Sequence, residues 1–303
     1  MSVNDKSLIE QAAKRLEELN RPRSGAARGG TAMGPGRMPT SSATAEQLRQ
    51  QAGPVSQEKS QSVEIDLDYL AEKGYVTPNA PRSRIADEFR ILKRPLLANA
   101  AGVGPLSIRH GNLIMVTSAV PGEGKTFCSI NLAMSIALEF DRSVLLVDAD
   151  VAKPSVPSYL GFPPGRGLLD VLDGSDPDLS QVMLRTNVEK LTLLTSGRAH
   201  GRATELLASA TMGQILEEIA TRYADRIVIF DSPPILVATE SAVLATQMGQ
   251  IVVVVHAETT SHAEVAHAIA AIEACPVKMT VLNQVRSAGQ GTFGHGYEYG
   301  YAY

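Results

Sequence analysis

The sequence has little cysteine and no long apolar run, and both absences restrict the kind of protein it encodes. Only two cysteines occur in 303 residues, Cys128 and Cys275, and they lie far apart and outside any metal-ligand spacing. This favours a reducing compartment and gives no sign of a disulfide framework. No apolar run approaches the roughly 18 residues that cross a bilayer. The first residues, MSVNDKSLIEQ, also lack the basic-then-apolar layout of a signal peptide. We therefore expect a cytoplasmic protein with no direct membrane insertion.

An excess of basic charge is missing as well. The 28 Lys and Arg residues are outnumbered by 32 Asp and Glu, which gives a formal net charge of −4. Nucleic-acid-binding domains usually carry a basic excess, so we expect no nucleic-acid partner. The apolar fraction of 44% is ordinary for a globular protein. The length suits one large α/β domain with extra segments, or two small domains.

The N-terminal region predicts two segments outside the main domain. Residues 1–19 predict an amphipathic helix, which is too short to be stable alone and either docks on a partner or stays solvated. The apolar residues near one face of this helix are Leu8, Ile9, Ala12, Leu16 and Leu19. Residues 20–62 are rich in Gly, Pro, Ser, Ala, Arg and Gln, which predicts a disordered linker.

Residues 63–288 predict a single α/β domain. A helix is expected over 83–98, with Pro95 ending or kinking it. The predicted strands are Leu113–Thr117, Val144–Asp148, Leu191–Leu194, Ile227–Asp231, Ile251–Val255 and Lys278–Leu282. The predicted helices between them cover 125–139, 203–222, 239–247 and 261–273. Short, continuously apolar strands that alternate with helices indicate a mostly parallel sheet covered on both faces.

A phosphate-binding motif lies between the first of these strands and its helix. Residues 119–126 read AVPGEGKT, which is the Walker A pattern with Ala119 where Gly is more usual. Loop N–H groups and the helix N-terminus favour phosphate, Lys125 reaches the β- and γ-phosphates, and Thr126 can ligate Mg²⁺. The alternative is an accidental glycine-rich turn. The predicted nucleotide-binding residues here are Pro121, Gly122, Glu123, Gly124, Lys125, Thr126 and Phe127.

Carboxylates end two further predicted strands. Asp148 and Asp150 follow one apolar strand, and Asp231 follows another. Ligands of open α/β sheets bind outside the carboxyl ends of the strands. These three carboxylates beside Thr126 therefore predict a Mg²⁺ site of hard oxygen ligands. An Asp after a strand can instead be a helix cap, and that alternative is strongest for Asp150.

With these motifs in view, the sequence resembles the bacterial tyrosine kinases of capsule and exopolysaccharide synthesis. More narrowly, it is similar to the autokinases of exopolysaccharide loci associated with PEP-CTERM/exosortase systems. The resemblance spans about residues 65–303 and implies a P-loop NTPase fold that uses ATP and Mg²⁺. It rests on PGEGKT, on DAD followed by Lys-Pro at 153–154, on FDSPP at 230–234 and on a tyrosine-rich C-terminus. Asn283 resembles the family's nucleotide-base contact, although Asn at a strand end also favours a turn.

The resemblance also implies a role for each residue of the site. Lys125 and Thr126 would hold the phosphates and Mg²⁺. Asp148 would accept the proton of an incoming tyrosine hydroxyl. Asp150 would support the metal and position that tyrosine, and Asp231 would be the Walker B carboxylate. Phosphoryl transfer asks mainly for positioning and charge stabilisation, which such a set supplies.

Two departures from the family pattern stand out. The family often carries Arg two residues after the second Asp of the strand end, where this chain has Ala152 followed by Lys153. Lys lacks the bidentate fork of Arg, which puts a role in charge stabilisation or subunit contact in doubt. The oligomerisation motif Glu-x-x-Arg-x-x-Arg is represented by Asp87, Arg90 and Lys93. These three are either a subunit contact or a solvated helix face.

The C-terminus predicts a substrate segment. Four of the eight tyrosines lie in the last seven residues, and residues 289–303 are rich in Gly, which predicts a flexible tail. Together with the nucleotide site, this favours autophosphorylation in trans within a homo-oligomeric ring. An exposed strand or a sticky low-complexity tail is the alternative. The predicted phosphoacceptors are Tyr297, Tyr299, Tyr301 and Tyr303.

The resemblance implies partners too. A membrane polysaccharide co-polymerase of the chain-length-determinant type would activate the kinase and recruit it to the inner face of the membrane, and a tyrosine phosphatase would reverse it. The main rival is a nucleotide-switched ATPase of the partitioning or septum-placement type. That class carries a signature lysine five positions before the Walker lysine, where this chain has Val120. A second rival is an adaptor that uses nucleotide only for folding.

Overall fold

The computed structural model describes residues 61–80, 82–103, 108–176, 178–222 and 225–286, with the side chain of residue 222 left out. The predicted helix 1–19, almost all of the predicted linker 20–62 and the predicted tail 289–303 lie outside this part. The first strand of the described part, β1, begins at Ser62, the last residue of the predicted linker. Among the described residues, no helix is long and apolar enough to cross a membrane.

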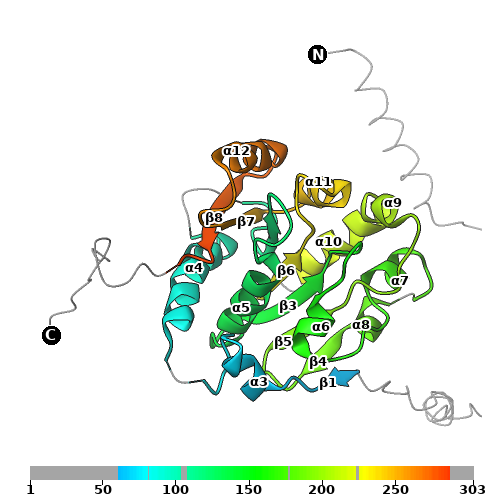
Figure 1. Ribbon diagram of the computed structural model, residues 1–303. Coiled ribbons are helices and arrows are strands. Elements are labelled where there is room, and N and C mark those ends of the chain that lie inside the picture. The colour runs from blue at the N-terminus through cyan, green and yellow to red at the C-terminus, as the bar shows by residue number, and fades with distance from the viewer. Residues whose placement is uncertain (1–60, 81, 104–107, 177, 223–224, 287–303) are drawn as a thin grey trace, which may run out of the picture. The chain divides into compact units, whose positions relative to one another are not determined.

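The described part is built on an eight-stranded sheet of order β1-β4-β5-β3-β6-β2-β7-β8 (Figure 1). Every pairing in it is parallel except β4 with β5, which confirms the predicted mostly parallel α/β sheet. The strands are β1 (Ser62–Val63), β2 (Leu113–Ser118), β3 (Ser143–Asp148), β4 (Leu184–Thr186), β5 (Leu191–Leu194), β6 (Arg226–Asp231), β7 (Gln250–His256) and β8 (Val277–Asn283).

Helices cover both faces of the sheet because its central strands are apolar on both sides. In β2, Ile114 and Val116 face one apolar cluster while Leu113 and Met115 face the other. Helices α3 to α6 contribute to the first cluster, and α7 to α12 contribute to the second. The helices are α3 (Leu67–Glu72), α4 (Arg84–Ala100), α5 (Lys125–Ala137), α6 (Val156–Leu160), α7 (Leu168–Leu172), α8 (Leu179–Val182), α9 (Ala203–Leu207), α10 (Ala210–Arg222), α11 (Thr239–Ala245) and α12 (His262–Ala271).

The sequence pattern missed the short elements and one helix break. Strands β1 and β4 are two and three residues long, too short to show a period. The single helix predicted over 203–222 is two helices, α9 and α10. Between them the Ser209 hydroxyl accepts from the Met212 amide at 3.2 Å, as a helix N-cap does, so a new helix begins there.

Helix α4 passes through Pro95 and continues to Ala100, five residues further. The helix predicted over 83–98 is therefore present, and of the two effects expected of Pro95, ending or kinking it, the ending does not occur. Proline removes one backbone donor and crowds the carbonyl four residues earlier. Packing of Phe89 and Leu96 into the first apolar cluster offsets that cost, since both side chains are buried.

Lys93 on α4 is buried and points into its own domain. Its Nζ donates to the carbonyl of Ser135 at 2.5 Å and pairs with Glu139 at 2.5 Å, which satisfies the C-terminal turn of α5. Asp87 and Arg90 form an exposed ion pair one turn earlier. Lys93 therefore does not share their solvated face, and only Asp87 and Arg90 stay candidates for a subunit contact.

We expect Lys93→Met to lower the free energy of unfolding by about 2 kcal/mol, because it removes a buried charge-assisted hydrogen bond while keeping the aliphatic stem. Urea denaturation followed by circular dichroism measures this change. Arg90→Met is the matched control on the same helix, and its exposed pair should contribute less than about 1 kcal/mol. Equal losses for the two variants would contradict the capping role.

Candidate active site

The P-loop joins β2 to α5 and its shape depends on two glycines. Gly122 and Gly124 both have φ of +89°, a backbone conformation that glycine adopts without strain. Gly124 is also the N-cap of α5, so Lys125 and Thr126 stand in the first turn of the helix. This is the strand, loop and helix arrangement that the motif predicts, at an end of the sheet where loop N–H groups can meet an anion.

The carboxylate of Glu123 holds the P-loop in place through hydrogen bonds to the rest of the domain. It is 1% exposed and accepts from the Val120 amide at 2.7 Å, from the His256 amide at 3.3 Å and from the Thr260 hydroxyl. Only the backbone of Glu123 is thus available to a phosphate. Its buried side chain ties the P-loop to the end of β7, a connection that no sequence motif signalled.

Two amides at the end of β8 hold the same loop from the other side. Asn283 Nδ2 donates to the carbonyl of Glu123 at 2.9 Å, and Gln284 Nε2 donates to the carbonyl of Gly122 at 3.0 Å. This bond uses one of the two N–H donors of Asn283 Nδ2, so its Oδ1 and the second N–H are left for a ligand. Gln284 was missed from the sequence because a lone Gln after a strand carries no distinctive signal.

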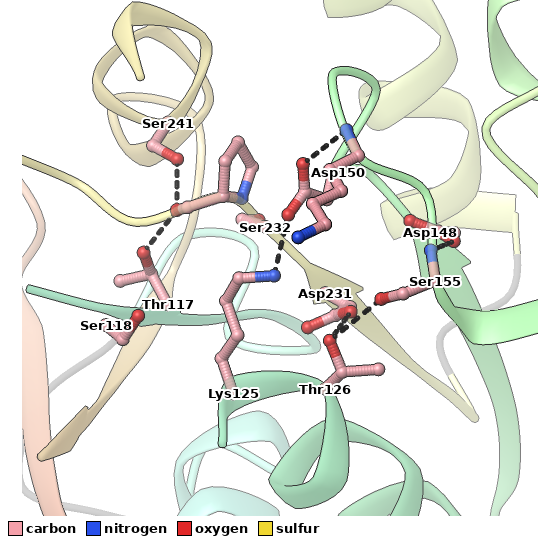
Figure 2. A network of polar contacts seen from close by, with 12 residues as sticks. Thr117, Ser118, Lys125, Thr126, Asp148, Asp150, Ser155, Asp231, Ser232 and Ser241 are labelled. Carbon is pink, nitrogen blue, oxygen red and sulfur yellow. Dashed lines mark hydrogen bonds and ion pairs between the residues drawn. The ribbon is translucent and has the colours of Figure 1, made fainter. Parts of the chain in front are cut away.

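Asp231 is fully buried and accepts hydrogen bonds from two hydroxyls of α5, of which Figure 2 shows that of Thr126. Thr126 Oγ1 donates to its Oδ2 at 2.7 Å, and Ser129 Oγ donates to its Oδ1 at 3.0 Å. The structure thus brings the predicted Thr126 and Asp231 together. Ser129 was overlooked, although it lies one helical turn after Lys125 and so shares its side of α5.

Lys125 is held by Asp150. Its Nζ lies 2.7 Å from Asp150 Oδ2, and the other oxygen of Asp150 accepts from the Lys153 amide at 3.0 Å (Figure 2). Both side chains are largely buried. When nucleotide binds, the ammonium group of Lys125 would leave Asp150 and contact phosphate oxygens instead. The ion pair therefore describes Lys125 in the nucleotide-free protein.

Asp148 has one satisfied and one unsatisfied oxygen. It pairs in register with Asp231 across β3 and β6, and its Oδ2 accepts from the amides of Ser155 and Val156, each at 3.0 Å. Its Oδ1 is buried and has no hydrogen-bond partner among the described residues. A buried carboxylate oxygen without a partner is costly unless a proton, a ligand or a metal-bound water meets it.

The electrostatics of the site follow from three carboxylates around one lysine. Burial and the charge of Asp231 raise the pKa of Asp148 to about 7, although the two backbone amides oppose this. Burial likewise raises the pKa of Asp231 against the charge of Lys125. Burial lowers the pKa of Lys125, but the charges of Asp231 and Asp150 outweigh it and the net shift is upward.

These residues fit ATP and Mg²⁺. No group of three or more His, Cys, Asp or Glu residues in the described part forms a metal cage. Mg²⁺ at nucleotide sites keeps several waters and uses substrate phosphates, so it needs only one or two protein oxygens. Thr126 Oγ1 and Asp231 supply such oxygens, and Oδ1 of Asp148 is left for a metal-bound water or for a proton of the substrate. Asp150 is engaged by Lys125 and is a weaker candidate for a ligand.

A pocket of about 710 Å³ opens beside the P-loop. Gly124 and Phe127 line it from the loop and α5, and Asn283 lines it from β8. Its size suits the base and ribose of a nucleotide whose phosphates lie on the loop. The predicted nucleotide-binding residues Phe127 and Asn283 thus lie in one pocket next to the phosphate-binding glycines.

Comparison with known proteins identifies the family. A model described as an AAA domain matches residues 111–283. Tyrosine-protein kinase YwqD of Bacillus subtilis (strain 168) is 30% identical over 226 residues, which cover 74% of this chain and 91% of YwqD. The chain belongs to the bacterial tyrosine kinase family.

Two further relatives show how much of the chain is similar to known tyrosine kinases. Tyrosine-protein kinase ptk of Acinetobacter johnsonii is 32% identical over 188 residues, which cover 61% of this chain. The chain spans about a quarter of the length of ptk and of other curated relatives. The kinase domain of the Escherichia coli tyrosine kinase ETK superposes with a TM-score of 0.57 at 23% identity, over 77% of this chain and 95% of that one, which supports the fold.

The departures from the tyrosine kinase pattern lie beside the site. Ala152 and Lys153 are both exposed, and the backbone of Lys153 supports Asp150. The segment that carries them therefore still positions a carboxylate without the usual arginine. The predicted phosphoacceptors Tyr297, Tyr299, Tyr301 and Tyr303 lie outside the described residues.

Proposed function

We propose that this chain is a cytoplasmic protein-tyrosine autokinase that transfers the γ-phosphoryl group of ATP to tyrosines of its own C-terminal tail. Transfer would occur in trans within a homo-oligomer and would regulate exopolysaccharide synthesis or export. The proposal includes the narrower exosortase-associated assignment, activation by a membrane polysaccharide co-polymerase that recruits the kinase to the inner face of the membrane, and reversal by a tyrosine phosphatase.

The observation that carries the proposal is the state of Asp148. Its carboxylate is buried beside the P-loop, one of its oxygens has no hydrogen-bond partner in the part of the chain that the structure describes, and its pKa is raised to about 7. A general base works best when its pKa lies near the working pH. A tyrosine hydroxyl placed against Oδ1 could pass its proton there while its oxygen bonds to the γ-phosphorus and the bond to the β-phosphate oxygen breaks.

The remaining residues position the phosphates and balance their charge. Lys125 would leave Asp150 for the β- and γ-phosphates, and the loop N–H groups after Gly122 would surround the phosphate oxygens. Bound Mg²⁺ would neutralise charge that develops between the β- and γ-phosphates. Thr126 and Asp231, already joined by a hydrogen bond, would hold that ion. Asn283 Oδ1 would accept from the base.

The rival function, a partitioning or septum-placement ATPase, lacks support at one position. Val120 occupies the place of that class's signature lysine, and it is partly buried against the second apolar cluster. It therefore cannot reach a nucleotide in a partner subunit. This favours the kinase over the nucleotide-switched dimer.

Phosphopeptide mass spectrometry of the purified chain with ATP and Mg²⁺ tests the proposal. We expect phosphate on Tyr297, Tyr299, Tyr301 or Tyr303 in the wild type, and at least about a 100-fold loss in Lys125→Met, because that variant keeps the side-chain length but loses the charge on the phosphates. Lys153→Met, an exposed lysine nearby, is the matched control. Unmodified tyrosines together with brisk ATP hydrolysis would overturn the kinase in favour of the ATPase.

A further inference from the structure

Strand β8 leaves a long backbone edge open. It is the last strand of the sheet, seven residues long, and it pairs with β7 through residues such as Asn283, whose carbonyl accepts from the Ala257 amide at 2.9 Å. Since backbone groups alternate along a strand, those of Lys278, Thr280 and Leu282 point to the outer side. No strand in the described part pairs with that side.

Open edges of this kind are normally short or protected by charge. The opposite edge of the sheet follows the rule, because β1 has only two residues. The only lysine of β8 does not guard its edge, because Lys278 Nζ turns back to the carbonyls of Glu273 at 3.2 Å and Cys275 at 2.6 Å. Leu282 is 62% exposed on the same strand. The edge thus has the character of a surface that another segment covers.

A groove runs beside this edge. Between β8 and α12 lies a pocket of about 380 Å³, lined by Val255, Val265 and Ala266 on one side and by Thr280 and Leu282 on the other. His262 at the start of α12 is the one titratable side chain among its lining residues. The groove is therefore mainly apolar, with a polar group at one end, which suits aromatic side chains that carry a hydroxyl.

The chain itself ends in a segment that matches the edge and the groove. Residues 297–303 read YEYGYAY, seven residues like β8, with tyrosine at every second position. In an extended conformation all four tyrosines lie on one face, because side chains alternate between the two faces of a strand. The 13 residues 284–296 connect the end of β8 to this segment and are rich in Gly, which is enough chain to reverse direction.

We propose that the unphosphorylated segment Tyr297–Tyr303 docks on its own domain as an extra antiparallel strand along β8, with tyrosine rings in the groove between β8 and α12. Main-chain hydrogen bonds to Lys278, Thr280 and Leu282 give the register, and the apolar groove selects the tyrosine face. A phosphate adds about −1.5 to −2 charges and cannot enter an apolar groove, so phosphorylation releases the segment. Only this release rests on the kinase activity proposed above.

Hydrogen exchange of full-length protein tests the docking. In the Lys125→Met background, without ATP, we expect the outer-edge amides of Lys278, Thr280 and Leu282 to exchange at least about 10-fold more slowly than in a chain truncated after residue 288. The inner-edge amides of Met279 and Val281 are an internal control and should not change. Equal exchange at the outer edge with and without the tail would overturn the proposal.

Two substitutions of the tail separate docking from a general effect of truncation. Replacing all four tyrosines by Phe keeps the rings and should keep the protection, whereas replacing them by Ser should abolish it. Protection that falls on tenfold dilution would assign the edge to a second copy and overturn docking in cis. In the wild type with ATP, protection should be lost only if phosphate appears on the tail, so a missing kinase activity leaves the docking result intact.

Discussion

Asp148→Asn should lower tail phosphorylation by about 10²–10⁴-fold, the usual contribution of a general base, and at the same time stabilise the nucleotide-free protein at alkaline pH. The folded-state pKa of Asp148 is raised from 3.8 to about 7, so the folded protein binds a proton that the unfolded chain releases between these values. Stability therefore falls as the pH rises through this window, and above it the charged carboxylate is a cost.

The upward shift of the Asp148 pKa corresponds to a loss of at most roughly 4 kcal/mol in the free energy of unfolding at alkaline pH, and relaxation of the site will make this loss smaller. Asn keeps an oxygen for the amides of Ser155 and Val156 and places no charge beside Asp231. Thermal unfolding in EDTA should show a midpoint higher by about 4 °C at pH 8, and the gain should shrink towards pH 4.

Asp173→Asn, at an exposed site on the same fold, is the matched control and should show no gain at pH 8. An Asp148→Asn variant that is less stable than the wild type at pH 8 would contradict the unfavourable burial of this charge. Loss of phosphorylation without the stability gain would mean that Asp148 acts in transfer while its charge is compensated in the free protein.

Gly124→Ala should reduce nucleotide affinity by at least about 100-fold, which corresponds to roughly 2.7 kcal/mol. A Cβ at this position would lie 2.2 Å from Asn283 Nδ2, and φ is +89°. The added carbon displaces the side-chain amide of Asn283, which donates to the carbonyl of Glu123. The P-loop therefore changes position in addition to carrying backbone strain. Isothermal titration with ADP and Mg²⁺ measures the effect.

The variant Gly122→Ala distinguishes the effect of backbone strain from the effect of steric overlap with Asn283. Gly122 has the same φ, but no atom of the described residues lies within 4 Å of a Cβ placed there, so only the conformational cost of about 1–2 kcal/mol applies. We expect the Gly124→Ala loss to exceed that of Gly122→Ala by at least tenfold. Adding Asn283→Ala to Gly124→Ala should raise the unfolding temperature of the single variant. Equal effects of the two alanines would contradict the role given to Asn283.

The sequence predicted the parts of the site that depend on strand ends. Asp148, Asp231 and the P-loop each follow an apolar strand, and parallel strands bring such ends to one edge of the sheet. The contacts that fasten the loop could not be predicted this way. Glu123 meets Thr260 across 137 positions, and Gln284 meets Gly122 across 162. Such pairs depend on how far β7 and β8 extend past the P-loop, and this length cannot be predicted from the spacing of apolar residues.

The behaviour of α4 shows a different limit. Proline at position 95 is unfavourable for a helix by local propensity, yet the helix continues because Phe89 and Leu96 are buried. Burial of Lys93 was also hidden, since a lysine three residues after an exposed Arg is normally solvated. The continuation of α4 past Pro95 and the burial of Lys93 both depend on tertiary contacts that override local preference.

Leu282 lies in the wall of two cavities at once. It lines the pocket beside the P-loop and also the groove between β8 and α12. We expect a molecule that moves this side chain toward one cavity to change the shape of the other, which would couple the binding of the two occupants. Such coupling is reciprocal: if nucleotide weakens the grip on the edge of β8 by some factor, an occupied edge weakens nucleotide binding by that same factor.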